Sequence, residues 1–385
     1  MKIQRTIIKA MFTGAVLLSM APCALAEPGV SDTTILIGRT SAISGPAGPQ
    51  QVSYEQGYAA ALKQINKNGG VHGRQIKMIV MDDAFDAKRT VANSLKMIDE
   101  DGVFALFSLN GTGQLTTMMP VIKEKKVPLF GAITGAQSLR SAENFNRYLF
   151  HVRAGYAEEM DTIIQHLYTL QQSKIIVIYQ NIPFGKALLA HIEASLSKRG
   201  APKLMGAFPV ESSGVGADAA VKEALKLNPD NIIVATAGTA SVVTVKAIKS
   251  SSLKSQIYGS SLLGVASLKK ALGDEVNGIV VTQVTTTPFD KGNELSKQYQ
   301  TAMHDIGVND FDYGSFEAYI NFRFFMEALK GAGHNLTREG LIKSIESRGE
   351  IKLGGFIAKY SPTNHDGSSY VDLTMVTSKP VKFIR

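Results

Sequence analysis

The chain has 385 residues, of which 44% are hydrophobic and 19% are charged, and its formal net charge is +8. This length and apolar content suit about two domains with sizeable cores, which excludes an intrinsically disordered protein. The lysines are scattered among acids, as in Lys123-Glu-Lys-Lys126, without the basic blocks and interleaved aromatics typical of nucleic-acid binding. We therefore expect no nucleic-acid partner.

Residues 1–26 have the features of a secretory signal peptide. Basic residues precede an apolar run at 10–20, and Ala24-Leu-Ala26 supplies the small residues at which signal peptidases cleave. We expect cleavage after Ala26, a soluble mature protein and a periplasmic location. The single cysteine, Cys23, lies inside this segment, where it fits an ordinary apolar-region residue better than a lipid anchor. The cleaved chain then contains no cysteine and forms no disulfide.

Beyond the signal, short β-rich apolar runs alternate with helical patterns, which predicts an α/β fold of mainly parallel sheets flanked by helices. The predicted strands are 35–39, 75–82, 103–107, 127–130, 174–179, 203–208, 231–235, 255–258, 278–284, 354–360 and 370–377. The predicted helices are 53–67, 87–100, 114–125, 157–170, 184–198, 215–227, 241–250, 266–272, 316–330 and 337–347. Two similar series, before and after about residue 151, indicate two lobes joined by a crossing at 148–155.

Three loops after strands of the first series combine glycine with small or hydroxyl-bearing residues. They are Ser44-Gly-Pro-Ala-Gly48, Asn110-Gly-Thr-Gly-Gln114 and Ala132-Ile-Thr-Gly-Ala136. Ligands bind at the carboxyl ends of strands in open α/β sheets, so these loops are candidates for a binding site. The 44–51 loop opens a helix, whose free N–H groups and partial positive charge suit an anionic ligand group. The alternative is that the loops serve only as turns and helix N-caps.

The order of several motifs resembles the branched-chain amino-acid-binding (Leu/Ile/Val-binding-like) family of ABC transporter substrate-binding proteins, which have the type I periplasmic binding fold. These motifs are Ser44-Gly-Pro46, Ile65-Asn-Lys-Asn-Gly-Gly-Val-His-Gly73, Asp82-Asp83-Ala-Phe-Asp86, Val127-Pro128 and Phe184-Gly185. The resemblance implies two lobes, each a mainly parallel sheet flanked by helices, with three hinge crossings. It assigns residues 27–152 and 285–353 to the N-terminal lobe, and 153–284 and 354–385 to the C-terminal lobe.

The resemblance also implies a set of ligand-binding residues in the cleft between the lobes. Thr112 corresponds to a hydroxyl that contacts the ligand carboxylate, and Thr134 and Ala136 to a loop that contacts its amino and carboxylate groups. Gln50 stands where an aromatic side chain often flanks the ligand, and Phe184 where tyrosine is frequent. Further expected contacts are Tyr156, Gly238, Thr239 and Ser261. For Tyr156 and Phe184, simple packing at the hinge or helix start is an equal alternative.

Ser261 departs from the family pattern. Amino-acid-binding members carry an acid there that pairs with the ligand ammonium, and truncating one partner of a buried charge pair costs about 2–5 kcal/mol. We therefore expect a small carboxylate or amide without an ammonium group, unless Glu317 or Asp290 supplies the missing acid. Both have more ordinary interpretations, Glu317 near a helix start and Asp290 in a solvated turn.

Patterns typical of enzymes are weak in this sequence. It contains no G-x-S-x-G and no H-x-x-x-H pair, and the S-x-x-K matches at 195–198 and 267–270 fall in or beside amphipathic helices. The carboxylates of Asp82, Asp83 and Asp86 suit a hard cation, but a structural role capping the next helix is the stronger interpretation. We expect no catalytic residue, no metal and no cofactor.

The sequence thus predicts the extracytoplasmic solute-binding component of an ABC importer. It would capture a small organic solute, a carboxylate, an amide or an amino-acid-like compound, between its lobes and deliver it as a monomer to permease subunits in the inner membrane. Closure is expected about 148–155, 281–287 and Gly354-Gly355. An extracytoplasmic sensor that uses the same cleft to signal to a membrane partner is the alternative.

Overall fold

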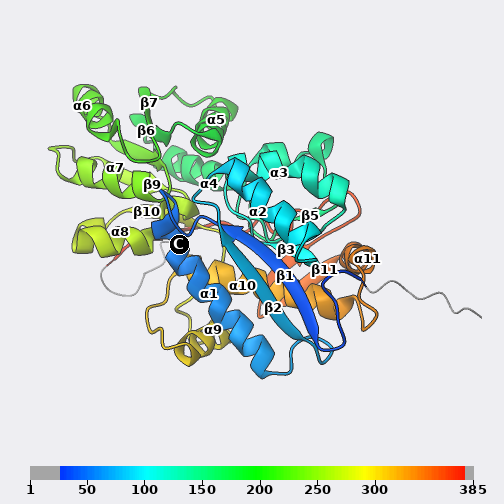
Figure 1. Ribbon diagram of the computed structural model, residues 1–385. Helices are drawn as coiled ribbons and strands as arrows, with labels where there is room; N and C mark the ends of the chain where they lie inside the picture. Colours follow the sequence, from blue (N-terminus) through cyan, green and yellow to red (C-terminus); the bar gives the residue numbers. More distant parts are fainter. Residues whose placement is uncertain (1–26, 378–385) are drawn as a thin grey trace, which may run out of the picture.

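The computed structural model describes residues 27–377, which form two α/β units, each with its own sheet (Figure 1). The predicted signal peptide, with Cys23, lies outside the described residues, as do residues 378–385. Within 27–377, no helix is both long enough and apolar enough to cross a membrane.

The first lobe contains a five-stranded parallel sheet in the order β2-β1-β3-β4-β5. Its strands are β1 (Thr34–Ser41), β2 (Gln75–Asp82), β3 (Ala105–Phe107), β4 (Leu129–Phe130) and β5 (Leu149–Phe150). Its helices are α1 (Gly48–Lys67), α2 (Ala87–Asp99), α3 (Thr112–Lys125), α9 (Glu294–Asp305), α10 (Tyr313–Gly331) and α11 (Arg338–Arg348). Helix α1 packs on α9 and α10, while α2 packs on α3.

The second lobe contains a six-stranded sheet in the order β13-β10-β9-β8-β6-β7, parallel except for β13. Its strands are β6 (Ile175–Gln180), β7 (Gly206–Val210), β8 (Asn231–Ala235), β9 (Gln256–Gly259), β10 (Val280–Gln283) and β13 (Asp372–Met375). Its α-helices are α4 (Tyr156–Thr169), α5 (Pro183–Lys198), α6 (Ala217–Leu227), α7 (Thr239–Lys249) and α8 (Val265–Leu272). Helix α4 packs on α5, and α7 packs on α6 and α8.

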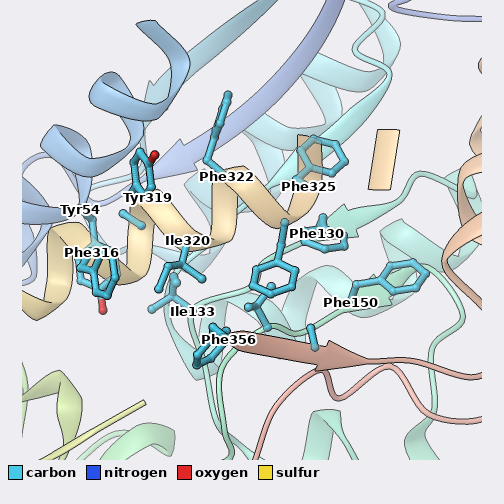
Figure 2. Packing of buried hydrophobic residues seen from close by; sticks show 14 of the residues in the cluster. Tyr54, Phe130, Ile133, Phe150, Phe316, Tyr319, Ile320, Phe322, Phe325 and Phe356 are labelled. Atoms are coloured by element: carbon cyan, nitrogen blue, oxygen red, sulfur yellow. The ribbon is translucent and has the colours of Figure 1, made fainter. Parts of the chain in front are cut away.

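Helix α10 forms the core of the first lobe, where its aromatic rings lie against the ends of the sheet (Figure 2). The Phe325 ring stacks on Phe107 at a centroid distance of 5.6 Å and on Phe130 at 5.2 Å. Phe130 in turn stacks on Phe150 at 5.9 Å. Each such ring contributes hydrophobic burial, and each pair adds about 0.5–1.5 kcal/mol beyond it. The aromatic packing therefore fixes β3, β4 and β5 against α10.

The chain passes between the lobes three times within the described residues, at 151–155, 284–293 and 360–371. The third passage differs from the expected hinge at Gly354-Gly355. Those glycines, with φ of 50° and 95°, form the turn of a hairpin between β11 (Glu350–Leu353) and β12 (Phe356–Lys359). Two successive positive φ angles suit the tight turn of a two-residue hairpin, so the chain turns back here beside α10 and crosses later.

The parallel α/β architecture that the sequence predicts is confirmed, and most predicted elements appear with shifts of a few residues at their ends. Helix α9 was not predicted. It begins at Asn293, whose side chain accepts hydrogen bonds from the N–H groups of Leu295 and Ser296, and it buries Leu295, Tyr299 and Met303. An asparagine N-cap before residues with this spacing is a recognisable helix signal.

Candidate functional site

A pocket lies between the lobes, at the carboxyl ends of strands from both sheets. Its cavity volume is about 20 Å³, room for about one water molecule, and it opens to solvent. Its lining residues are Pro46, Ala47, Gln50, Phe85, Asn110, Gly111, Thr112, Tyr156, Gln180, Phe184, Ala237 and Leu262. This is where ligands are expected in open α/β sheets, and none of these described lining residues is charged.

Five helices begin at this pocket, and their N-cap residues supply no side-chain hydrogen bond. These N-cap residues are Ala47 for α1, Gly111 for α3, Gly155 for α4, Ile182 for α5 and Gly238 for α7. Helices α2, α9, α10 and α11 are capped by the side chains of Asp86, Asn293, Asp312 and Thr337, whereas α6 and α8 lack such caps as well. The positive ends of five helix dipoles lie at the pocket, which favours an anionic or strongly polar ligand group.

A cluster of three hydroxyl groups lies at the start of α3 and α4. The Thr112 Oγ1 is 2.9 Å from the Thr134 Oγ1 and 3.5 Å from the Tyr156 hydroxyl, which is 3.3 Å from the Thr134 Oγ1. Thr112 and Tyr156 line the pocket, whereas Thr134 lies fully buried behind them. The Ala136 N–H donates to Thr134 Oγ1, and Ala136 is fully buried as well. Thr134 and Ala136 therefore hold Thr112 in place from outside the pocket lining.

Aromatic side chains form an apolar wall of the pocket. The Tyr156 and Phe184 rings meet edge to face at 5.4 Å, so these residues both pack at a helix start and line the pocket. Gln50 also lines it, from the first lobe. Asn110 lies in one of the three candidate loops, whereas Phe85, Gln180 and Leu262 were not among the expected contacts. Gln180 ends β6, so the rule that placed the other loops at strand ends could have found it.

The amide of Gln180 is fixed by two hydrogen bonds of the second lobe. Its Nε2 donates to the Ser212 Oγ at 2.9 Å, and its Oε1 accepts from the Ala237 N–H at 3.1 Å. Phe85 had no comparable sequence signal, because its position depends on a positive φ of 64° in the turn after β2. Thus a fixed neutral amide and an aromatic ring complete a lining of hydrogen-bonding and apolar groups.

Gly238 and Thr239 lie at the edge of the pocket and contact the first lobe. The Thr239 N–H donates to the Pro46 carbonyl oxygen at 2.9 Å. The 44–51 loop was expected to present N–H groups to an anion, yet here its proline carbonyl accepts a bond from the opposite lobe. The neighbouring Ala237 lines the pocket itself.

Ser261 belongs to a buried charge network outside the pocket lining. Arg153, in the first crossing, donates from Nη2 to the Ser261 Oγ at 2.6 Å and to Glu159 Oε1 at 2.9 Å. Glu159 Oε2 accepts from the Ser261 N–H at 2.8 Å and from the Thr282 hydroxyl at 2.6 Å. Glu159, fully buried, is thus satisfied by donors from the second lobe and the crossing.

Glu317 joins the same network from the first lobe. Its Oε1 lies 3.3 Å from the Arg153 Nη1, and its Oε2 accepts from the Tyr54 hydroxyl at 2.7 Å. Burial raises the pKa of Glu317, while Arg153 acts in the opposite direction. Burial would lower the pKa of Arg153, but Glu317 and then Glu159 outweigh it and raise that pKa. Glu317 is therefore a buried ion-pair member rather than an ordinary residue near a helix start, whereas Asp290 lies in an exposed turn.

The three aspartates after β2 shape the neighbouring loops. Asp82 accepts hydrogen bonds from the Ser44 hydroxyl at 2.6 Å and the Ser44 N–H at 3.1 Å, which lower its pKa to about 2. Asp83 accepts from the hydroxyls of Thr40 and Thr90, and Asp86 caps α2. Among residues 27–377, no group of three or more His, Cys, Asp or Glu side chains could hold a metal ion.

Comparison with known proteins shows the family to which this chain belongs. The sequence matches the periplasmic binding protein family over residues 34–380. It is 23% identical over 350 residues to Leu/Ile/Val-binding protein homolog 1 of Brucella abortus (strain 2308), covering 89% of this chain and 90% of that protein.

Two solved structures share the fold over almost their whole length. The fatty acid ABC transporter substrate-binding protein from Thermomonospora curvata is 19% identical with a TM-score of 0.83, covering 94% of this chain and 93% of that chain. A branched-chain amino acid ABC transporter protein from Thermus thermophilus with bound valine is 15% identical with a TM-score of 0.83, covering 92% and 96%. These relatives are substrate-binding proteins, not enzymes. The chain therefore belongs to the periplasmic binding protein family and has its two-lobed type I fold.

Proposed function

We propose that this protein captures a small organic solute between its lobes in the periplasm and delivers it, as a monomer, to the permease subunits of an ABC importer. The observation that carries the proposal is the pocket between the lobes, which both lobes line and at which five helices without side-chain caps begin. The names of the relatives, which include ABC transporter substrate-binding proteins, support the partnership with a permease.

The expected ligand has a carboxylate or amide at one end and an apolar body. Thr112 at the start of α3 can donate to the polar end, and the edge-to-face pair of Tyr156 and Phe184 can cover the apolar part. The pocket lining offers only neutral side chains, so recognition rests on hydrogen bonds and helix dipoles.

An ammonium group finds no free acid in this arrangement. Arg153 already donates hydrogen bonds to Ser261 and Glu159 and lies at ion-pair distance from Glu317, so a second cation here would be repelled by the guanidinium. Glu159 accepts three hydrogen bonds. A carboxylate or amide without an ammonium therefore fits better than an α-amino acid. One of the two structural relatives is named for fatty acid and the other is described with bound valine, and both have a TM-score of 0.83. The fold therefore does not distinguish between these ligand classes, and the choice depends on the residues of the site.

Closure would bring the two lobes together about the three passages of the chain. We propose a division near residues 152 and 284, with residues 285–353 returning to the first lobe. Strand pairing and helix contacts support this division, with α9 and α10 beside α1 and with α4 beside α5. They also support adding the β11–β12 hairpin to the first lobe, so that the last change of lobe lies within 360–371.

A thermal-shift screen tests the ligand class. The panel contains branched and polar amino acids, aliphatic and aromatic monocarboxylates, dicarboxylates, amides and urea. A compound that binds only the native state raises the melting temperature. At a concentration 100 times its Kd, it adds about 2.7 kcal/mol to the free energy of unfolding. We expect a shift with a carboxylate or amide that lacks an ammonium group. Stabilisation by leucine or valine alone would contradict that class, and no shift with any compound would contradict small-solute capture of the classes tested.

A further inference from the structure

The 46–49 segment of the first lobe accepts two hydrogen bonds from the second lobe. The Pro46 carbonyl oxygen accepts from the Thr239 N–H at 2.9 Å, at the first turn of α7. The Pro49 carbonyl oxygen accepts from the Ser267 hydroxyl at 2.8 Å, on α8. Both acceptors face out of the first lobe, and neither bond involves a residue that carries charge. Two separate helices of the second lobe thus bond to one short loop.

The segment that carries these acceptors, the 44–47 loop and the first turn of α1, is held by contacts within the first lobe. Its Ser44 N–H and hydroxyl both bond to the Asp82 carboxylate. Gly45 has a φ of 77°, and a Cβ on it would lie 2.6 Å from the Ala84 carbonyl oxygen, so the loop packs tightly on the turn after β2. The prolines at 46 and 49 restrict φ as well. The acceptor oxygens are therefore pre-positioned, and little ordering remains when the second lobe arrives.

Gly238 permits the close approach between the lobes. Its φ of 59° and ψ of −134° lie in a region that residues with a Cβ rarely adopt. A Cβ on Gly238 would lie 2.3 Å from the Pro46 carbonyl oxygen and 3.1 Å from the Ala47 Cα. Both atoms belong to the backbone of the opposite lobe, so neither can move aside as a flexible side chain would. Pro46, Ala47 and Ala237 line the pocket, which places this contact at its rim.

We propose that Gly238, Thr239 and Ser267 form a latch that holds the lobes closed over the ligand without touching it. Gly238 lets the backbones approach, and the other two residues donate the hydrogen bonds. These three residues act by positioning one lobe against the other, not by binding the ligand. The family resemblance assigned Gly238 and Thr239 to ligand contact, whereas here they act on the opposite lobe. This inference rests on the proposed function in one respect, namely that closure of the lobes serves to capture a solute.

The chain offers a matched control for a substitution at Gly238. Gly273, at the end of α8 in the same lobe, has a φ of 56° and a ψ of −130°, nearly the same backbone conformation. A Cβ on Gly273 would meet no described atom within 4 Å. Gly238→Ala and Gly273→Ala therefore impose the same local strain, and only the first places an atom between the lobes.

The test measures closure without any ligand. Pro49→Cys and Ser267→Cys are introduced into a Cys23→Ser background, which removes the only other cysteine, and the purified protein is treated with a short bis-maleimide. The Ser267→Cys substitution removes the hydrogen bond from Ser267, so the rate of intramolecular cross-linking, followed by mass spectrometry, reports how often the remaining contact of Gly238 and Thr239 with Pro46 forms. We expect Gly238→Ala to slow cross-linking about tenfold or more, as overpacking does elsewhere, and Gly273→Ala to leave it unchanged.

Three outcomes would overturn the latch. They are equal rates for Gly238→Ala and the starting protein, equal slowing by both glycine substitutions, and no cross-linking in the starting protein. Should Gly238→Ala fail to fold by circular dichroism, Thr239→Pro replaces it. Proline is accepted at the first position of a helix, yet it lacks the N–H that bonds to Pro46, so the same slowing is expected. Because no ligand is added, failure of the ligand screen leaves this result unaffected.

Discussion

Two polar clusters lie close together in this protein, and they differ in charge and in access to the pocket. Thr112, Thr134 and Tyr156 form an uncharged cluster, two members of which line the pocket. Arg153, Glu159 and Glu317 form a charged cluster that no lining residue belongs to. The three charged side chains thus pair with one another and join the crossing to both lobes, and the ligand meets neutral donors and helix ends. A charge that is buried beside a pocket is therefore not available to a ligand when it is already paired.

The largest effect is expected from breaking the charged cluster. Arg153→Met would leave Glu159 and Glu317 without their shared cation, which costs about 3–5 kcal/mol when one partner of a buried pair is removed. Urea unfolding at neutral pH measures the loss. As a control, Lys226→Met removes the exposed pair with Glu223 and should cost less than about 1 kcal/mol. Similar losses for the two variants would show that the buried cluster contributes no more than a surface pair.

The uncharged cluster is expected to affect binding more than stability. Thr112→Ala removes the hydroxyl at the pocket, and a hydrogen bond to a charged ligand group contributes about 1.5–3 kcal/mol, so affinity should fall about tenfold or more. Isothermal titration with the compound that gives the largest thermal shift measures it. Thr117→Ala, an exposed position on the same helix, is the matched control and should bind normally. Unchanged affinity of Thr112→Ala would remove this hydroxyl from the binding site.

A smaller effect, with a defined pH dependence, is expected at the partly exposed Asp82. Its pKa of about 2 lies below the ordinary 3.8, chiefly because of the Ser44 hydrogen bonds. The carboxylate therefore stabilises the fold above about pH 3.8, and this stabilisation is lost as the pH falls toward about 2. Since the Asp82 side chain is 33% exposed, Ser44→Ala should cost only about 1 kcal/mol at pH 7.

Urea unfolding of the Ser44→Ala protein and the unsubstituted protein at several pH values checks this sign. The difference in unfolding free energy should shrink as the pH falls from about 4 toward 2, because Asp82 becomes protonated in both folded proteins only near the lower end of this range. A difference that stays constant over this range would assign the Ser44 effect to loop packing instead of to the ionised carboxylate.

The smallest effect is expected from adding an acid to the charged cluster, where we predict no change in ligand binding. Ser261→Asp introduces an acid at the position where the family resemblance leads one to expect it, but the Arg153 Nη2 lies 2.6 Å from the Ser261 Oγ and would pair with it. We therefore expect no thermal shift with leucine or valine in this variant. A shift with either amino acid would show that Arg153 leaves the added carboxylate free, and would reopen the ammonium site.

Much of the site could be placed from the sequence because it follows from local rules. Thr112 follows a strand and opens a helix, and the carboxyl-end rule brings such residues to one edge of a parallel sheet. The same rule reaches Gln180, which ends β6. The turn at Gly354-Gly355 has a local signal too, because a two-glycine loop between apolar runs is typical of a hairpin, and the hinge expected there is wrong.

The charge network could not be predicted in the same way. Arg153 and Glu317 are far apart in the sequence, and they meet only because α10 lies in the first-lobe core beside the crossing. Before that packing is known, Glu317 is an ordinary acid near a helix start.

By itself, the sequence determined the α/β architecture, the strand-end loops and the absence of an acid at Ser261, since each depends on residues close together in the chain. Only the tertiary structure decided which cation sits beside Ser261, which side of the 46–49 loop faces the second lobe, and why Gly238 carries no side chain. These depend on how closely two separately built lobes approach, and a backbone distance of that kind leaves no pattern in either segment alone.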